Sequence, residues 1–278
     1  MDYNRKVELA IKLLQSIPQD GPIELSYSGG KDSDVILELA KMAGIPFEAI
    51  YKQTTIDPPG TTAHAKEMGV TIVKPKKTFL QLVSEYGLPS RFHRYCCDVL
   101  KEYKVHDRAI QGIRRSESPN RAKRYKEPEV CRVYSKTEKV RIYLPILEWT
   151  DADVERFINE RGIKCAPVYY DEDGNFDVKK RLGCLCCPLA SRNKMIEQYK
   201  KYPKFLKAEI RAIGEFQRKK PNGSSARRFH NPYNHLFFHI FCDNMEQYDL
   251  RVNGGILPDS GIDTKKFLED YFKTDLTY

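Results

Sequence analysis

The sequence predicts an α/β fold, in which helices flank a Rossmann-like parallel β-sheet. Between Ile23 and Lys74, short apolar runs alternate with segments whose apolar residues recur at helical spacing. Turn residues such as Gly44 separate these segments. The resulting β–α–β–α–β order favours parallel pairing through helical crossovers. With 278 residues, the chain has room for one sizeable α/β core and a smaller appended region.

The elements are expected in the following order. Apolar periodicity predicts a first helix over 3–16, which the segment from Pro18 to Gly21 ends. The expected strands are 23–27, 45–51, 70–74, 109–113 and 140–147. The helices expected between and after them are 34–43, 61–69, 79–86, 101–109 and 152–161. A loop region follows over 165–193, then a basic helical segment over 194–217 that is interrupted near Pro203, and an aromatic, turn-rich tail from Phe229.

The formal net charge of +9 is unevenly distributed. The segment from Ser191 to His230 holds twelve Lys or Arg and three Glu, and the segment from Arg91 to Lys126 holds eleven against four acids. Basic blocks of this kind suit a polyanion, such as nucleotide phosphates or nucleic acid. Solvated helix faces remain the alternative for the 191–230 block.

The cellular location is expected to be cytoplasmic, with no membrane partner. No apolar run approaches the roughly 20 residues that cross a bilayer. The residues after Met1 are polar and charged, without the apolar stretch of a secretory signal.

Eight cysteines in a cytosolic chain favour metal or redox chemistry over a disulfide framework. Cys96 and Cys97 are adjacent, and a second group lies in Cys184-Leu185-Cys186-Cys187. The isolated cysteines are expected to be buried as small apolar side chains; they are Cys131, Cys165 and Cys242.

The hexapeptide Ser28-Gly29-Gly30-Lys31-Asp32-Ser33 lies between a predicted strand and a predicted helix. Its two glycines allow a sharp turn and a close approach to phosphate oxygens. The N–H groups and the positive dipole end of the following helix then favour an anion. Lys31 adds a mobile charge, whereas Asp32 either holds a magnesium ion or caps the helix. The spacing differs from that of a Walker loop.

This hexapeptide resembles the PP-loop of ATP pyrophosphatases, which split ATP between its α and β phosphates. The resemblance implies that a substrate is adenylated and pyrophosphate released. We expect Lys31 to stabilise charge at the α–β bridge and Asp32 to hold part of a Mg²⁺ ion. The residues expected to cradle the β and γ phosphates are Ser28, Gly29, Gly30 and Ser33.

An arginine-rich loop, 112–121, follows the strand predicted over 109–113 and lies at the edge of the sheet where ligands bind in open α/β folds. Arginine forks match phosphate oxygens; a solvated surface loop is the alternative. Asp57, after the second predicted strand, is a weaker candidate for the adenosine or metal side, and a turn-forming role for it is equally compatible with the sequence.

The phosphate loop, the segment Gly112-Ile113-Arg114-Arg115-Ser116-Glu117-Ser118 and four cysteines together resemble the phosphoadenylylsulfate (PAPS) reductase family. This family belongs to the adenine-nucleotide α-hydrolase (HUP-type) superfamily, and the similarity covers about residues 20–190. Its Gly-x-Arg-Arg loop contacts the anionic end of the nucleotide, which implicates Gly112, Arg114 and Arg115. The expected domains are therefore a nucleotide-binding domain with a four-cysteine site over 1–190 and a basic, aromatic, mainly helical region over 191–278.

The pattern Cys-Cys … Cys-x-x-Cys resembles the [4Fe–4S] site of adenylylsulfate reductases and of DNA phosphorothioation enzymes. It implies as ligands Cys96, Cys97, Cys184 and Cys187. Thiolates suit iron–sulfur or zinc, and unliganded thiols are a further alternative. Two alternatives involve Cys186. It could replace Cys184 or Cys187 as a ligand, or it could carry sulfur as a free thiol.

Two features depart from the reductases. The chain has no Glu-Cys-Gly-Leu-His motif, and its late cysteine, Cys242, lies in an apolar-aromatic stretch. The full PP-loop form resembles members that still process ATP.

The resulting prediction is an ATP pyrophosphatase that supports sulfur transfer to a nucleic acid, as in DNA phosphorothioation or tRNA thiolation. An adenylylsulfate or PAPS reductase is the alternative, and a non-enzymatic nucleotide-sensing or scaffold subunit is a third hypothesis.

The predicted partners are ATP and a nucleic acid, DNA or tRNA. Aromatic residues interleave with the basic 191–230 block, so stacking on bases is one interpretation and internal packing is another; they are Tyr199, Tyr202, Phe205 and Phe216. Two further expectations are left undecided by the sequence: a cysteine desulfurase as sulfur donor, and a homo-oligomeric state.

Overall fold

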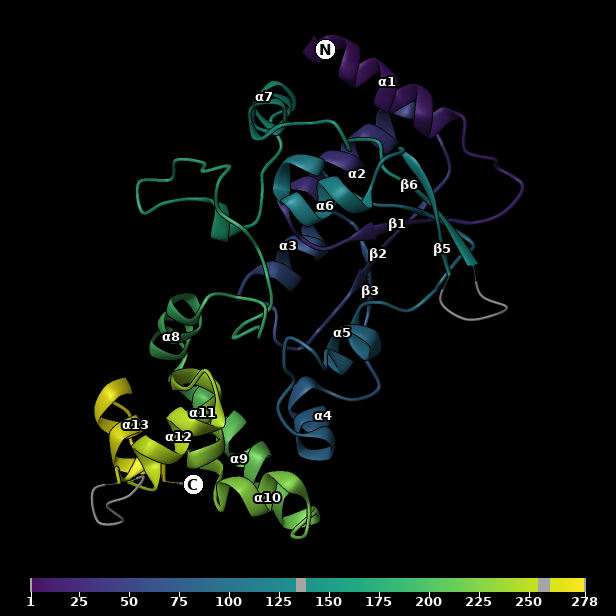
Figure 1. The fold of residues 1–278 in the computed structure, drawn as a ribbon. Helices are drawn as coiled ribbons and strands as arrows, with labels where there is room; N and C mark the ends of the chain where they lie inside the picture. Colours follow the sequence, from purple (N-terminus) through teal and green to yellow (C-terminus); the bar gives the residue numbers. More distant parts are fainter. Residues whose placement is uncertain (1, 134–138, 255–260, 278) are drawn as a thin grey trace. The chain divides into compact units, whose positions relative to one another are not determined.

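A computed structural model describes residues 2–133, 139–254 and 261–277 (Figure 1). The chain forms two compact units, each from two segments. Unit 1 comprises Met1–Pro75 and Val99–Gly183, and unit 2 comprises Lys76–Asp98 and Cys184–Tyr278. This division differs from the predicted boundary at residue 190. Because helix α4 (Phe79–Tyr86) packs against helix α9 (Pro203–Lys219), the segment before the first cysteine pair belongs with the C-terminal helices.

Unit 1 is built on a six-stranded sheet in the order β3-β2-β1-β4-β6-β5. Its strands are β1 (Ile23–Tyr27), β2 (Glu48–Lys52), β3 (Thr71–Val73), β4 (Arg108–Ile110), β5 (Glu129–Val133) and β6 (Lys139–Tyr143). Five strands are parallel, and β5 pairs antiparallel with β6. Leu25 of the central strand β1 pairs with Ala49 on one side and with Ile110 on the other. The α/β, Rossmann-like prediction is confirmed.

Helices cover this sheet because their apolar stripes need a partner surface. They are α1 (Tyr3–Gln15), α2 (Lys31–Ala43), α3 (Thr61–Glu67), α6 (Pro119–Arg124) and α7 (Asp151–Arg161), with short 3-10 helices η1 (Arg115–Glu117) and η2 (Pro167–Tyr169). Figure 1 shows α1 and α7 near α2, and the contacts of α2 with both helices agree. Ile36 and Leu39 of α2 are fully buried in the core with Phe157 of α7.

The least accurate part of the prediction lies before β4. The helix expected over 101–109 does not form: α5 (Tyr95–Leu100) ends first, and Arg108–Ile110 joins the sheet between β1 and β6. The segment between them has no apolar stripe to support a helix, and Lys104 pairs with Asp107. Strand β5 was absent from the prediction. Its side chains alternate between exposed and half-buried, as is typical of an edge strand.

Unit 2 is helical. Besides α4 it contains α8 (Arg192–Lys201), α9, α10 (Ser224–Phe229), α11 (Pro232–Phe241), α12 (Met245–Val252) and α13 (Thr264–Phe272), so the tail expected to be rich in turns is mostly helix. Tyr199 is fully buried and stacks on Phe205, which favours the packing interpretation for these two aromatic residues. In neither unit do the described residues include a helix that is both long enough and apolar enough to cross a membrane.

Candidate functional site

The predicted phosphate loop joins β1 to α2 at the carboxyl end of the central strand. Gly29 has φ +76, and a Cβ there would lie 2.6 Å from Thr61 Cγ2, so this position requires glycine. Gly30 is the N-cap of α2 and provides no side-chain cap. Ser33 is held within the turn, since its Oγ donates to Gly30 O at 2.6 Å. The loop therefore presents the positive end of a 13-residue helix without a capping carboxylate.

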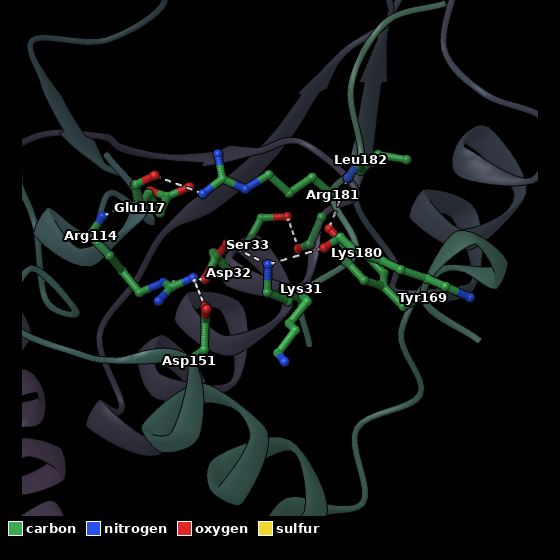
Figure 2. Close-up of polar contacts among 12 residues, drawn as sticks. Lys31, Asp32, Ser33, Arg114, Glu117, Asp151, Tyr169, Lys180, Arg181 and Leu182 are labelled. Carbon is green, nitrogen blue, oxygen red and sulfur yellow. Dashed lines mark hydrogen bonds and ion pairs between the residues drawn. The ribbon is translucent and has the colours of Figure 1, made fainter. Parts of the chain in front are cut away.

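Tyr169, from η2, lies at this helix terminus and was not anticipated from the sequence (Figure 2). Its hydroxyl accepts a hydrogen bond from the backbone of Lys31 and one from Leu182 N at 3.4 Å. Burial raises the pKa of Tyr169 to about 12, so the hydroxyl is protonated at neutral pH. The Lys31 ammonium lies 5.4 Å from the ring centroid and 3.5 Å from Lys180 O. The tyrosine thus occupies part of the anion-binding end of α2 and contacts its lysine.

A polar cavity of about 320 Å³ opens at the loop. Its described lining comes from β1, the phosphate loop, the arginine-rich loop and the segment after η2. The lining residues are Ser26, Ser28, Gly30, Lys31, Asp32, Ser33, Gly112, Glu117, Arg121, Tyr169, Arg181 and Leu182. Gly112 is required by a close approach, because a Cβ there would lie 2.8 Å from Asp32 O. Five of the six predicted loop residues and Gly112 therefore meet at one cavity, with Gly29 shaping the turn between them.

Arg114 is almost fully buried and does not line this cavity. Its Nε donates to Asp32 Oδ1 at 2.6 Å and its Nη2 to Asp151 Oδ1 at 2.8 Å. Nη1 donates to Ser116 Oγ at 2.9 Å, and that hydroxyl donates to Trp149 O at 2.8 Å. Because protein groups accept these hydrogen bonds, the Arg114 guanidinium supports the Asp32 carboxylate and does not line the cavity (Figure 2).

Arg115 is directed to another part of unit 1. Its Nε donates to Tyr125 O at 2.8 Å, Nη2 bonds to Lys126 O, and Nη1 pairs with Glu148. It is not among the residues lining the cavity. Asp57 accepts from Thr54 N at 2.8 Å and closes the turn after β2, as the turn-forming alternative expected, and it is not a lining residue either.

Two other arginines do line the cavity. Arg121, on α6, pairs with Glu117, and Arg181 Nη2 donates to Glu117 O at 2.7 Å (Figure 2). Burial is the largest effect on the Arg121 guanidinium, and it lowers the pKa of that group. Arg121 belongs to the arginine-rich loop recognised in the sequence, whereas Arg181 was missed. The only signal for Arg181 was the basic run Lys179-Lys180-Arg181 before the second cysteine group.

The four predicted cysteine ligands all belong to unit 2. Cys96 and Cys97 lie on α5, and Cys184 and Cys187 lie on the loop before α8. The pKa of Cys96 is raised, first by its hydrogen bond with Cys97, then by burial and by the charges of Cys187 and Cys184. The thiols of both segments therefore act electrostatically on Cys96. Among the described residues, no three His, Cys, Asp or Glu side chains are arranged to hold one metal ion.

Arg91 holds the two cysteine segments together. Its Nε donates to Pro188 O at 3.0 Å and its Nη2 to Ala190 O at 3.3 Å. Cys186 is buried with φ +49, and its N–H donates to Gln198 Oε1 at 2.8 Å. Burial raises the pKa of its thiol, and the charge of Cys187 adds to the effect. Of the isolated cysteines, Cys165 and Cys242 are buried as expected, but Cys131 is exposed on edge strand β5.

Residues 22–190 match the family described as the phosphoadenosine phosphosulfate reductase domain. The chain belongs to the PAPS reductase-like family of the PP-loop superfamily.

The proteins similar to this chain carry different descriptions. An uncharacterized protein of Methanocaldococcus jannaschii is 26% identical over 71% of this chain and 42% of its own length. Sulfate adenylyltransferase subunit 2 of Shewanella pealeana is 28% identical over 54% of this chain and 61% of its own. The chain thus spans about half the length of the curated relatives it matches. A PAPS reductase structure from Candida auris, a phosphate complex, has a TM-score of 0.41 at 14% identity, covering 64% of this chain and 96% of that one.

Proposed function

We propose that this PAPS reductase-like protein is an ATP pyrophosphatase that cleaves ATP between the α and β phosphates and adenylates an acceptor. The cleavage supports sulfur transfer to a nucleic acid, as in DNA phosphorothioation or tRNA thiolation. The observation that carries the proposal is the polar cavity at the start of α2, which Lys31, Arg121 and Arg181 line. Three cations and a helix dipole at one cavity suit a triphosphate.

In this proposal the loop residues Ser28, Gly29, Gly30 and Ser33 bind the β and γ phosphates through backbone N–H groups and hydroxyls. Phosphate oxygens replace the Tyr169 hydroxyl at the Lys31 amide, since a charged acceptor makes the stronger hydrogen bond. Lys31, released from its weak contact with Lys180 O, then stabilises the charge that develops at the α–β bridge.

Arg121 and Arg181 take the role that the family resemblance implied for Arg114 and Arg115. Both guanidinium groups line the cavity and share Glu117 as a partner. They bind the α-phosphate and the anionic end of the acceptor. Arg114 is a positioning residue, because it orients Asp32 from behind.

Asp32 also fits the magnesium expectation. Mg²⁺ is commonly held by one or two carboxylates together with substrate phosphates. Asp32 lines the cavity, and its Oδ2 lies 3.5 Å from Lys31 Nζ. A metal ion brought in by the triphosphate would supply Lewis-acid stabilisation there.

The charges of Cys184 and Cys187 act on the Cys96 thiol, which supports one site shared by the two cysteine segments. Four thiolates suit an iron–sulfur cluster, with zinc as the alternative. In a [4Fe–4S] cluster each thiolate binds a different iron atom. We assign Cys96, Cys97, Cys184 and Cys187 to this cluster, which would supply electron transfer or sulfur handling. A cysteine desulfurase is the proposed sulfur donor.

The comparisons support the ATP route in one respect. Sulfate adenylyltransferase, the name of several relatives, denotes transfer of an adenylyl group. The alternative, an adenylylsulfate or PAPS reductase, takes its support from the family description. It needs a reactive thiol, and Cys242 is instead buried in an aromatic cluster with its pKa raised by burial.

The decisive experiment is pyrophosphate release from ATP by anaerobically purified protein, with and without DNA or tRNA. Lys31→Ala is expected to abolish release, and Lys179→Ala, an exposed lysine outside the cavity, serves as the matched control. Sulfite release from adenylylsulfate with a thiol donor, without pyrophosphate release from ATP, would establish the reductase instead.

Iron and sulfide analysis of the same preparations tests the cluster. Cys96→Ser is expected to lose iron and sulfide, whereas Cys186→Ser should retain them because its thiol is directed toward Met195 O. Zinc in place of iron, or loss of iron in both variants alike, would contradict the ligand assignment.

A further inference from the structure

Unit 2 has a basic surface that the proposed chemistry does not use. From Phe216 to Cys242 the chain contains no Asp or Glu. Lys219 and Lys220 are directed to α4, where they bond to Ser84 Oγ and Glu85 O. Arg218, Arg227 and Arg228 are exposed, at the end of α9 and in the last turn of α10. Three exposed arginines therefore lie in a segment of the sequence that has no acidic residue.

A cavity of about 460 Å³ opens at this surface. Its lining includes Gly214, Gln217, Arg218, His230 and Asn231. Gly214 lies in the interior of α9, where glycine costs about 1 kcal/mol relative to alanine. The rest of the lining is apolar and includes Ala226 and two prolines. Polar groups, a cation and apolar groups thus surround a volume of the size of a small-molecule site.

His230 shows backbone strain at the rim. It has φ +57, in the left-handed region that favours glycine, and its N–H donates to Ala226 O at 3.0 Å. The ring is exposed and lines the cavity. Strained non-glycine residues of this kind gather at functional sites, and a histidine ring is one of the side chains on which nucleic-acid bases stack.

We propose that this cavity is a nucleic-acid site: Arg218, Arg227 and Arg228 bind backbone phosphates, and one base enters the cavity against His230. The inference rests on the proposed function, because it takes the acceptor of that reaction to be a nucleic acid. It adds where the acceptor binds and which side chains hold it.

The positions of the exposed apolar residues in unit 2 favour a nucleic acid over a membrane or another protein as the partner. Membrane-surface helices place large apolar side chains beside their cations, and protein interfaces have an apolar core. In the described part of unit 2, the exposed large apolar side chains lie on other elements; they are Tyr86, Phe92, Leu189, Leu250 and Tyr271. A cationic, hollow surface without them suits phosphates and a base.

The test is fluorescence anisotropy with a labelled 20-nucleotide single-stranded DNA, its duplex and tRNA, in the absence of ATP, from 50 to 200 mM salt. Arg218→Glu with Arg227→Glu is expected to weaken binding about tenfold and to lower the salt slope by about 1.4 for single strands, as two lost phosphate contacts predict. His230→Ala should weaken single-strand binding at least about fivefold, by loss of stacking. Circular dichroism checks that each variant is folded.

Lys266→Glu with Lys273→Glu on and just after α13 is the charge-matched control and should leave binding unchanged. Equal weakening in both double variants, or binding of phosphatidylserine vesicles in place of nucleic acid, would overturn the proposal. Pyrophosphate release by the wild-type protein is measured separately, with and without DNA or tRNA. No release under either condition, together with nucleic-acid binding, would refute the pyrophosphatase alone, whereas intact release without nucleic-acid binding would refute this site alone.

Discussion

The buried Arg114 and the half-buried Asp32 form an ion pair, with Nε 2.6 Å from Oδ1. The pair connects the arginine-rich loop to the first turn of α2. An arginine expected from family resemblance to bind phosphate is therefore held by a carboxylate of the phosphate loop itself.

Arg114→Gln is expected to lower pyrophosphate release about a hundredfold through kcat, because Asp32 loses its orientation. The loss of this charge pair should also cost about 2–3 kcal/mol in the free energy of unfolding. Arg115→Gln, whose partners are mainly backbone oxygens at a partly exposed site, should cost about 1 kcal/mol or less. A rise in KM for ATP with kcat unchanged would show instead that Arg114 contacts the substrate.

Arg181→Ala and Arg121→Ala should each weaken ATP or pyrophosphate binding by about 1.5–3 kcal/mol, the range for hydrogen bonds to charged groups. Isothermal titration calorimetry measures this affinity. Arg161→Ala is the control, since its partner is Glu38 and it does not line the cavity. Unchanged affinity in both cavity variants would place the phosphates elsewhere.

Comparing Gly29→Ala with Gly44→Ala separates a steric clash from backbone strain at glycines with positive φ. The new Cβ would meet Thr61 Cγ2 at 2.6 Å, so the loop must move and nucleotide binding should be lost. Gly44→Ala introduces a similar strain, at φ +67, into open space. It should lower stability by about 1 kcal/mol with ATP binding retained. Comparable binding losses in the two variants would show that strain alone, rather than the close approach, disturbs the site.

The stability of unit 2 should decrease as pH rises from about 4.5 to 7. Burial raises the pKa of Glu209 to about 7 from its ordinary value of 4.5, so the folded state keeps a proton that the unfolded chain releases in this window. The full effect is on the order of 3 kcal/mol. Hydrogen-exchange protection factors of peptides from α9 measure it.

Glu209→Gln should flatten this pH dependence, since a neutral amide still accepts from the Tyr199 hydroxyl that lies 2.5 Å from Glu209 Oε2. Glu215→Gln on the same helix should retain the slope. Protection that rises with pH in the wild-type protein would contradict the assignment.

Local patterns were sufficient to predict five of the six described strands and the turn between β1 and α2 that carries Ser28 to Ser33. The helix at Phe79–Tyr86 was predicted with its observed bounds, because Gly87 ends it and its apolar residues recur at helical spacing. Strand β5 was missed because its residue types do not follow its alternating burial: Cys131 and Val133 are exposed, whereas Arg132 is half-buried.

The roles of the arginines depend on contacts distant in sequence. Arg114 reaches Asp32 across 82 positions, and Arg181 reaches Glu117 across 64. No spacing rule relates such pairs, so the sequence could identify a cationic loop but not which of its side chains faces the ligand. Tyr169 was missed for the same reason: only the folded chain brings its hydroxyl to the start of α2.

The discontinuous make-up of unit 2 affects how the chain is synthesised. Residues 76–98 leave the ribosome about 90 residues before Cys184 begins the segment on which they pack. At about 5–20 residues per second, Phe79, Leu82 and Val83 spend seconds without their native neighbours. This interval makes the nascent chain a target for chaperones that bind apolar segments. It also means that a nonsense mutation near residue 183 would release a protein whose second helix group lacks most of its core.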